Sequence, residues 1–172
     1  YNNYYRQTPT QVGGLANVTR ISAGNAYSLA LKTDGTVWAW GDNSHGQLGA
    51  AQPTQSEVPI QVLGLTGITA ISAGYWHSLA IKSDGSVWAW GWNTYGQIGN
   101  GVAVDAAVLP VQVLPPGPTT AIDAGFLHSL AVVSGTVWGW GYNAHGQIGD
   151  GTTLPRMSPV NTGITGVTDV SS

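Results

Sequence analysis

One segment of 50 residues is repeated three times along the chain, and this period restricts the fold more than any other feature. The phrase V-W-x-W-G-x-N-x-x-G-Q-[LI]-G stands at residues 37–49, 87–99 and 137–149. A second phrase, A-G-x-x-[HY]-S-L-A, precedes it at residues 23–30, 73–80 and 124–131. A third, P-x-Q-V, stands at residues 9–12, 59–62 and 110–113, and a weaker copy begins at Pro159. A fixed period of this size is typical of modular folds whose units pack against their neighbours.

The low charge of the chain excludes several classes of protein. Charged residues make up 8% of the sequence, against about 25% in an average soluble domain. A disordered chain would be more charged, and a membrane-inserted one would carry a long apolar run, which is absent from this sequence. The net charge is −3 and the five basic residues are scattered, which argues against nucleic acid as a partner. The chain has no cysteine, so disulfides, thiolate metal sites and a cysteine nucleophile are excluded.

Each repeat reads as a set of short β-strands. Residues 79–82 and 87–90 are β-prone runs on either side of an Asp-Gly turn, which is a strong hairpin signal. Residues 18–22, 68–72 and 120–123 predict an earlier strand in each copy, and the P-x-Q-V phrase predicts another. A helical period of useful length is missing from the sequence. About four strands per unit is the content of a propeller blade.

The repeats closely resemble those of the regulator of chromosome condensation family. The phrases that carry the resemblance are A-G-Y-W-H-S-L-A-I, D-G-S-V-W-A-W-G and N-T-Y-G-Q-I-G-N-G, at residues 73–81, 84–91 and 93–101. The resemblance implies an all-β protein built of about three four-stranded β-propeller blades. The family's nucleotide exchange on a small GTPase depends on loops and a basic tail that this composition does not provide, so we do not expect it here.

Three repeats are too few for a closed ring, because propellers typically need four to eight blades. We expect an incomplete ring, completed by missing sequence or by self-association, or left as an open arc. The predicted organisation is a tail at residues 1–7 and a repeat domain at 8–172. Its repeats are 8–57, 58–108 and 109–158, with a partial fourth at 159–172. The chain begins at Tyr1 and stops as a further strand starts, which predicts a piece of a longer protein.

Residues that recur in every copy are interpreted as scaffold. His77 and His128 share one slot, filled by Tyr27 in the first copy, and are expected to hydrogen-bond backbone within their own blade. Asn43, Asn93 and Asn143 are expected to stabilise turns. The six repeated tryptophans, at 38, 40, 88, 90, 138 and 140, are expected in the blade core.

Catalytic, cofactor and metal sites are not predicted. Ser129, His128 and Asp123 contain the residue types of a hydrolase triad, but Ser129 belongs to the repeat. The glycine-rich loop at 96–101 lacks the lysine and helix of a phosphate-binding loop. His45 and His145 are about one hundred residues apart and lack a local ligand pattern. We therefore expect a protein that is not an enzyme and has no cofactor.

The residues that differ between copies are candidates for binding. If equivalent slots project to one rim of the blades, the variable aromatics form a strip there, or they pack against the adjoining blade instead. The candidate interaction rim is Asp42, His45, Trp92, Tyr95, Tyr142 and His145, with Tyr75, Trp76 and Phe126 as secondary candidates. Tyrosine and tryptophan are favoured anchors of protein interfaces.

These patterns predict a non-catalytic binding or assembly module. The leading partner is another protein, including further copies of this chain. The alternative is a glycan or surface polymer that stacks on the rim aromatics, and an enzyme is the least favoured reading. Low charge together with abundant Thr, Asn and Gly favours a secreted or cell-surface bacterial protein by a small margin over a cytoplasmic one.

Overall fold

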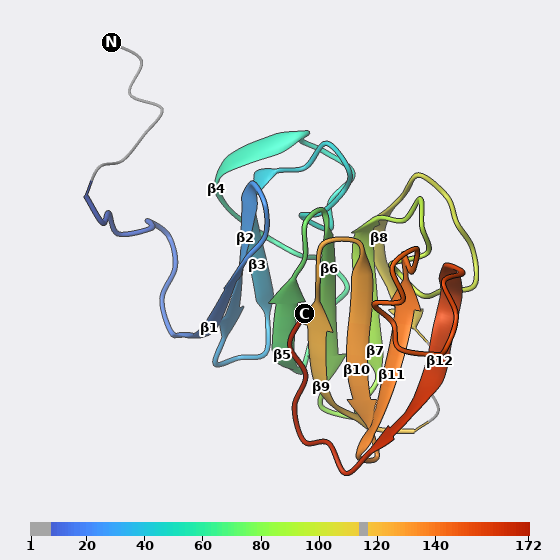
Figure 1. Ribbon diagram of the computed structural model, residues 1–172. Coiled ribbons are helices and arrows are strands. Elements are labelled where there is room, and N and C mark those ends of the chain that lie inside the picture. Colours follow the sequence, from blue (N-terminus) through green and yellow to red (C-terminus); the bar gives the residue numbers. More distant parts are fainter. Residues whose placement is uncertain (1–7, 114–116) are drawn as a thin grey trace.

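The computed structural model describes residues 8–113 and 117–172, and these residues form three antiparallel sheets of four strands each (Figure 1). We refer to the sheets as blades 1, 2 and 3. Blade 1 contains β1 (Val18–Ala23), β2 (Tyr27–Lys32), β3 (Val37–Asp42) and β4 (Gln55–Gln61). Blade 2 contains β5 (Ile68–Ala73), β6 (His77–Lys82), β7 (Val87–Trp92) and β8 (Ala106–Val113). Blade 3 contains β9 (Thr119–Ala124), β10 (His128–Val133), β11 (Thr136–Gly141) and β12 (Arg156–Thr165).

Strand order within each blade follows the sequence, so every pairing joins consecutive strands. The Asp-Gly turns close the hairpins as expected: the Asp34 carboxylate accepts from the Thr36 backbone N–H, and Asp84 accepts from Ser86 in the same way. The third copy has a shorter turn, in which Ser134 and Gly135 both have positive φ. Helix is absent from the described parts of the chain, 8–113 and 117–172, and with it any helix able to cross a membrane. The all-β blade architecture is thus confirmed.

The blades stack face to face, and each contact between neighbours has its own apolar core. Between blades 1 and 2, Leu29, Val37 and Leu48 pack against Trp90 and Ala80. Between blades 2 and 3, the corresponding cluster includes Leu79, Val87, Ile98 and Trp140. The three sheets do not close into a ring (Figure 1).

The P-x-Q-V phrase supplies the fourth strand of the blade that precedes it along the chain. Pro59 lies in β4, Pro110 in β8 and Pro159 in β12, each beside the strand that carries W-x-W-G. The first copy, residues 9–12, is not a strand, because its pairing partner would belong to a blade before blade 1. Each sheet begins ten residues after the predicted start of its repeat, at 18, 68 and 119 against 8, 58 and 109.

The burial of the tryptophans depends on whether a preceding blade covers their face. Trp90 and Trp140 are fully buried against the preceding blade, and Trp88 and Trp138 are partly buried beside the same clusters. The prediction of a core position is wrong for Trp38 and Trp40, which are only half-buried and belong to neither cluster. Trp40 occupies the place of Trp90 and Trp140 in blade 1, and no sheet formed by residues 8–113 and 117–172 covers it.

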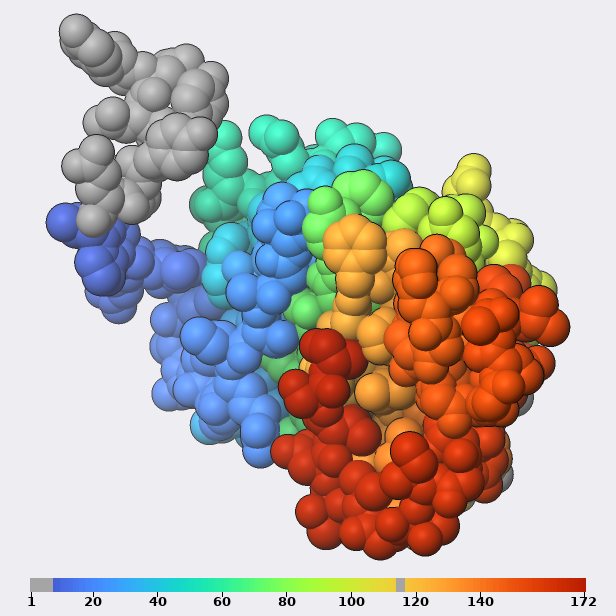
Figure 2. All heavy atoms as spheres, viewed as in Figure 1, coloured from blue at the N-terminus to red at the C-terminus, as the bar shows by residue number. Residues whose placement is uncertain are grey.

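The last six residues occupy the place of a first strand in a fourth blade. Val167 donates to the carbonyl of Gly135, as Ile68 does to Gly35 and Thr119 to Gly85. Ser172 donates through its backbone N–H and its hydroxyl to Asp123, as Ala73 and Ala124 donate to Ser22 and Ser72. In Figure 2 this segment, in dark red, lies on the surface beside blade 3. Asp123, the acid that replaces the repeated serine, therefore holds the end of the chain. The predicted tail at 1–7 lies outside the described residues.

Candidate functional site

A continuous run of aromatic rings crosses all three blades at one end of the molecule. We call it the aromatic strip, and its members in order of contact are Phe126, Tyr75, Trp76, His45, Trp92, Tyr95, Tyr142 and His145. Ring centroids of successive members are between 4.2 Å (Tyr75 to Phe126) and 6.2 Å (Tyr142 to His145) apart. These separations are within the range of direct aromatic contact.

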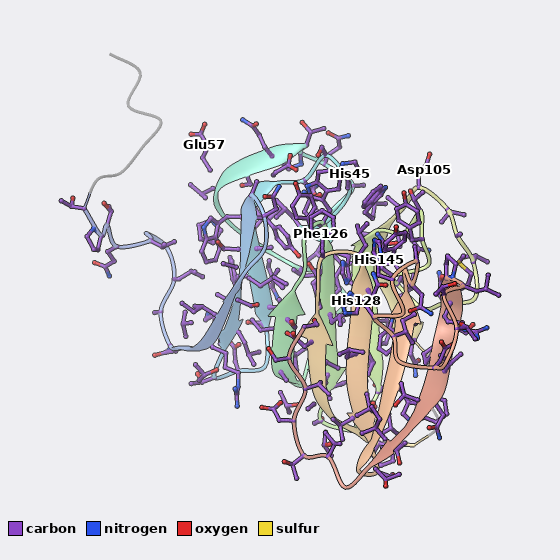
Figure 3. The ribbon with its side chains drawn as sticks, in the orientation of Figure 1. His45, Glu57, Asp105, Phe126, His128 and His145 are labelled. Carbon is purple, nitrogen blue, oxygen red and sulfur yellow. The ribbon has the colours of Figure 1, made fainter. Side chains whose placement is uncertain are left out.

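Two sets of loops build the strip, and backbone hydrogen bonds hold them together. The A-G loops carry Tyr75, Trp76 and Phe126, Trp92 is the last residue of β7, and the loops after β3, β7 and β11 carry the remaining rings. Trp92 N–H donates to the Trp76 carbonyl at 2.9 Å, and Tyr142 N–H donates to Leu127 at 2.9 Å. Figure 3 shows His45, Phe126 and His145 at the same end of the molecule, with Glu57 and Asp105.

The repeated glutamine fixes the backbone under one strip residue in each blade. The Gln47 Oε1 atom accepts from His45 N–H at 2.9 Å, Gln97 from Tyr95 at 2.9 Å and Gln147 from His145 at 3.0 Å. The repeated asparagines hold the same loops: Asn43, Asn93 and Asn143 accept from the backbone N–H groups of Leu48, Ile98 and Ile148. The scaffold holds the backbone in place, and the side chains it displays are the ones that vary.

Asp42 differs from the other candidate rim residues. Its carboxylate accepts from Gln47 Nε2 at 2.6 Å and from the Ser44 hydroxyl at 2.8 Å, so it is engaged within its own loop. Trp92 holds the equivalent position in blade 2 and cannot accept such a bond. The Nε2 atom of Gln97 is consequently buried without a hydrogen-bond partner among the described residues. Blade 2 lacks this polar contact and has an indole at the centre of the strip.

The rings of the strip differ in how much of their surface is exposed to a partner. Phe126 is 60% exposed, and His145 is also exposed. The other six rings are partly buried, mostly against one another. The structure thus brings together every aromatic residue of the candidate rim and the three secondary candidates, and leaves Asp42 outside the strip. The variable slots of the A-G loops predicted Tyr75, Trp76 and Phe126 only as secondary candidates, and the structure places them in the same run of rings.

A second group of polar residues links neighbouring blades. His77 Nε2 lies 3.0 Å from Ser129 Oγ, and the Tyr27 hydroxyl donates to the His77 carbonyl in the next blade. The expectation of bonds within a single blade is therefore wrong, because this slot points across the interface. Burial raises the pKa of Tyr27 and lowers the pKa of His77 to about 3. Both side chains are uncharged at neutral pH and serve the packing of blades.

The remaining titratable residues do not assemble into a triad. Ser129 bonds His77 rather than His128, and Asp123 bonds Ser72 and Ser172. Desolvation acts to raise the pKa of Asp150, but hydrogen bonds from Arg156 and Thr152 lower it to about 2. Within residues 8–113 and 117–172, His, Asp and Glu do not gather in groups of three or more that could hold a metal ion.

Comparison with protein families identifies the repeats. A model described as the regulator of chromosome condensation (RCC1) repeat matches residues 34–81, 84–132 and 134–172. A second model with the same description matches residues 18–47 and 68–97.

Individual relatives match over short stretches. Protein pim1 of Schizosaccharomyces pombe is 42% identical over 48 residues, which is 28% of this chain and 9% of that protein. The probable E3 ubiquitin-protein ligase HERC6 of Homo sapiens is 40% identical over 53 residues, which is 30% of this chain and 5% of that protein. Each match covers less than a tenth of the relative, so ligase activity does not follow for this chain.

Solved structures match over most of the chain. The structure of Prp20p from Saccharomyces cerevisiae, described with its binding properties to Gsp1p and histones, superposes with a TM-score of 0.78 at 26% identity. The match covers 87% of this chain and 39% of Prp20p. A structure of Kap60 bound to yeast RCC1 (Prp20) gives a TM-score of 0.78 at 25% identity, covering 87% of this chain and 37% of the matched one.

Proposed function

The chain belongs to the regulator of chromosome condensation (RCC1) repeat family, and on this premise we propose that it is a non-catalytic protein-binding module whose contact surface is the aromatic strip. The relatives support a protein-interaction or regulatory role in general. Prp20 is known in a structure with Kap60, and its own structure is described with binding to Gsp1p and histones, all of which are proteins. The description of Prp20p includes histones, so the expectation that nucleic acid is not a partner gains no support from this relative.

The aromatic strip is the observation that carries the proposal. Aromatic side chains supply large contact area at a low cost in conformational entropy, and they dominate the binding energy of protein interfaces. The strip is already assembled, because ring contacts and loop hydrogen bonds hold its members before a partner arrives. Preorganisation of this kind reduces the entropy lost on binding.

The glycan alternative predicted from the sequence gains no support from these relatives. Self-association and a secreted, cell-surface or bacterial origin likewise remain predictions. We therefore design the test so that a glycan ligand would be recognised.

The test uses a random peptide library displayed on phage and selected on the immobilised chain. Peptides enriched on the wild type are expected to lose binding to the double variant Trp92→Ala/Tyr95→Ala. The matched control is Val58→Ala/Leu63→Ala, which removes two exposed apolar side chains outside the strip and should retain binding. Circular dichroism and the melting temperature establish that each variant is folded.

The result that would overturn the proposal is equal binding by the wild type and a folded strip variant. If the Trp92 variant unfolds, Phe126→Ala/His145→Ala replaces it, because these two rings are exposed. A signal on a glycan array that requires the strip, together with an empty peptide selection, would assign the strip to the glycan alternative.

A further inference from the structure

Blade 1 has an exposed apolar face. The equivalent faces of blades 2 and 3 are each covered by the preceding blade. We call the exposed face of blade 1 the Trp40 face and define it by Ile21, Ser28, Ala30 and Trp40. It lines a cavity of about 370 Å³. Ile21 is 79% exposed, whereas the equivalent Ile71 of blade 2 packs in the core between blades.

The chain contains two complete examples of what covers such a face. In the first, the Gln47 carbonyl accepts from Trp90 Nε1 at 2.9 Å and from the Ser78 hydroxyl at 3.0 Å, and Ser78 also bonds Tyr27. In the second, the Gln97 carbonyl accepts from Trp140 Nε1 at 2.9 Å and from the Ser129 hydroxyl at 2.9 Å, and Ser129 also bonds His77. The covering blade therefore always presents one glutamine carbonyl and one tyrosine or histidine. The covered blade always presents one serine and one tryptophan.

Blade 3 presents the covering half of this interface on its far side. We call this the Leu130 face and define it by His128, Leu130, Gln147 and Gly149. His128 is in the slot of Tyr27 and His77, and Gln147 is in that of Gln47 and Gln97. A Cβ built on Gly99 would lie 2.7 Å from Trp140, and one built on Gly49 would lie 3.2 Å from Trp90. At Gly149 nothing lies within 4 Å of such a Cβ. The place that a following tryptophan would fill is open.

We propose that the Trp40 face of one copy of this chain binds the Leu130 face of a second copy. Trp40 Nε1 then donates to the Gln147 carbonyl of the other copy, and Ser28 pairs with its His128. The contact repeats, between two molecules, the contact that the chain makes twice within itself. Because the two faces differ, the association is head-to-tail, and it produces a closed ring or an open chain of copies.

Two segments compete with the second copy, and both lie outside the sheets. Residues 167–172 occupy the place that β1 of a docked copy would take, but they form no strand. Val12 and Leu15 line the cavity at the Trp40 face, yet residues 8–14 are exposed and likewise form no strand. β1 and β12, by contrast, are paired with their own sheets. When a second copy docks, its paired strand therefore displaces the unpaired segment, which is residues 167–172 at one face and residues 8–14 at the other.

The experiment is the solution mass of this 172-residue chain, measured by light scattering as a function of protein concentration. The wild type is expected to rise from 17.8 kDa to twice that mass or more. Ile21→Lys should stay at the monomer mass, because a lysine at this site is solvated in the monomer and buried in the complex. Leu63→Lys is the matched control, since it places the same charge at a site that is 71% exposed and outside both faces. It should associate as the wild type does.

A third variant tests the competition at the Leu130 face. Asp123→Ser restores the serine found at Ser22 and Ser72, removes the carboxylate that holds Ser172, and keeps an acceptor for a docked β1. It should associate at lower concentration than the wild type. A monomer mass for both wild type and Asp123→Ser up to millimolar concentration would overturn the proposal, as would association of Ile21→Lys equal to that of Leu63→Lys. The aromatic strip uses other residues, so either proposal can fail alone.

Discussion

Ser129 Oγ in blade 3 lies 3.0 Å from His77 Nε2 in blade 2 and donates its own proton to the Gln97 carbonyl. A hydroxyl has one proton to donate. The bond from His77 therefore requires a proton on Nε2, which leaves Nδ1 unprotonated in the neutral ring. His77 Nδ1 is buried without a hydrogen-bond partner among the described residues, so protonation there would place a charge in an apolar interface.

The first prediction concerns pH. Burial lowers the pKa of His77 to about 3, while the unfolded chain binds the proton near pH 6.5. The unfolded state thus holds more protons between these values, and the free energy of unfolding falls as pH decreases from 6.5. The loss attributable to His77 is at most about 1.4 kcal/mol per pH unit. Urea denaturation at a series of pH values measures the slope.

The control for this slope is His77→Tyr, because Tyr27 fills the same slot in blade 1 and also bonds the serine of the next blade. The variant should remain folded and lose part of the pH dependence between pH 4 and 6.5. Burial also lowers the pKa of His128, so some dependence should remain. An unchanged slope would show that His77 is protonated in the folded chain.

The second prediction compares glycines at equivalent positions. Gly99→Ala and Gly149→Ala both introduce a Cβ at positive φ, +81° and +80°, which costs about 1 kcal/mol. Only Gly99→Ala also forces atoms against the Trp140 ring, adding about 1–3 kcal/mol. Thermal unfolding should therefore show a clearly lower melting temperature for Gly99→Ala. Equal decreases in melting temperature for the two variants would mean that the Trp140 ring moves aside without a loss of stability.

The third prediction concerns Asp42. Asp42→Ala removes the acceptor of Gln47 Nε2 and leaves a buried amide unpaired, as Gln97 already is in blade 2. The expected cost is about 1–3 kcal/mol in the free energy of unfolding. Asp105→Ala, at an exposed acid near the same end, is the control and should change stability by less than about 0.5 kcal/mol. Guanidinium denaturation distinguishes the two variants.

The fourth prediction separates the centre of the aromatic strip from its end. Trp92 contacts three rings, those of His45, Trp76 and Tyr95, whereas Phe126 contacts Tyr75. Trp92→Ala should cost about 2 kcal/mol in stability, and Phe126→Ala less than about 1 kcal/mol. Comparable losses for both variants in a denaturant titration would argue that the strip is no more tightly packed at its centre.

Much of the fold could be predicted because the same strand and turn patterns occur in three copies of the repeat. The Asp-Gly turns, the β-prone runs on either side of them and the invariant asparagines each follow from local chemistry, and the strands lie where these patterns place them. The assignment of P-x-Q-V to the preceding blade depends on pairing between distant residues, such as Trp88 with Gln112. Strand patterns alone do not determine that pairing.

The candidate site was harder to predict, because it depends on which loops meet in space. The variable slots identified most of the rings, but whether Trp76 would contact Trp92 depends on hydrogen bonds between two loops of one blade. Alternation along a strand puts Trp38 and Trp40 on one face, but it does not show that no blade among the described residues covers this face of blade 1. Asp42 was grouped with the aromatics by position, whereas its chemistry directs it to Gln47.

The consecutive strand order of the three sheets has a consequence for how the chain folds. Every ladder joins strands that are consecutive in the sequence and lie in one blade, so the hairpins closed by short turns can form early, and the fourth strands and the contacts between blades follow. Stability then resembles that of a linear array, in which each unit is supported by its immediate neighbours. Blade 2 has a blade on both faces, whereas blades 1 and 3 each have one; residues 167–172 are hydrogen-bonded to blade 3, and blade 1 has no such segment bonded to it among the described residues. Local opening should therefore begin at blade 1, and hydrogen exchange should be slowest in the strands of blade 2.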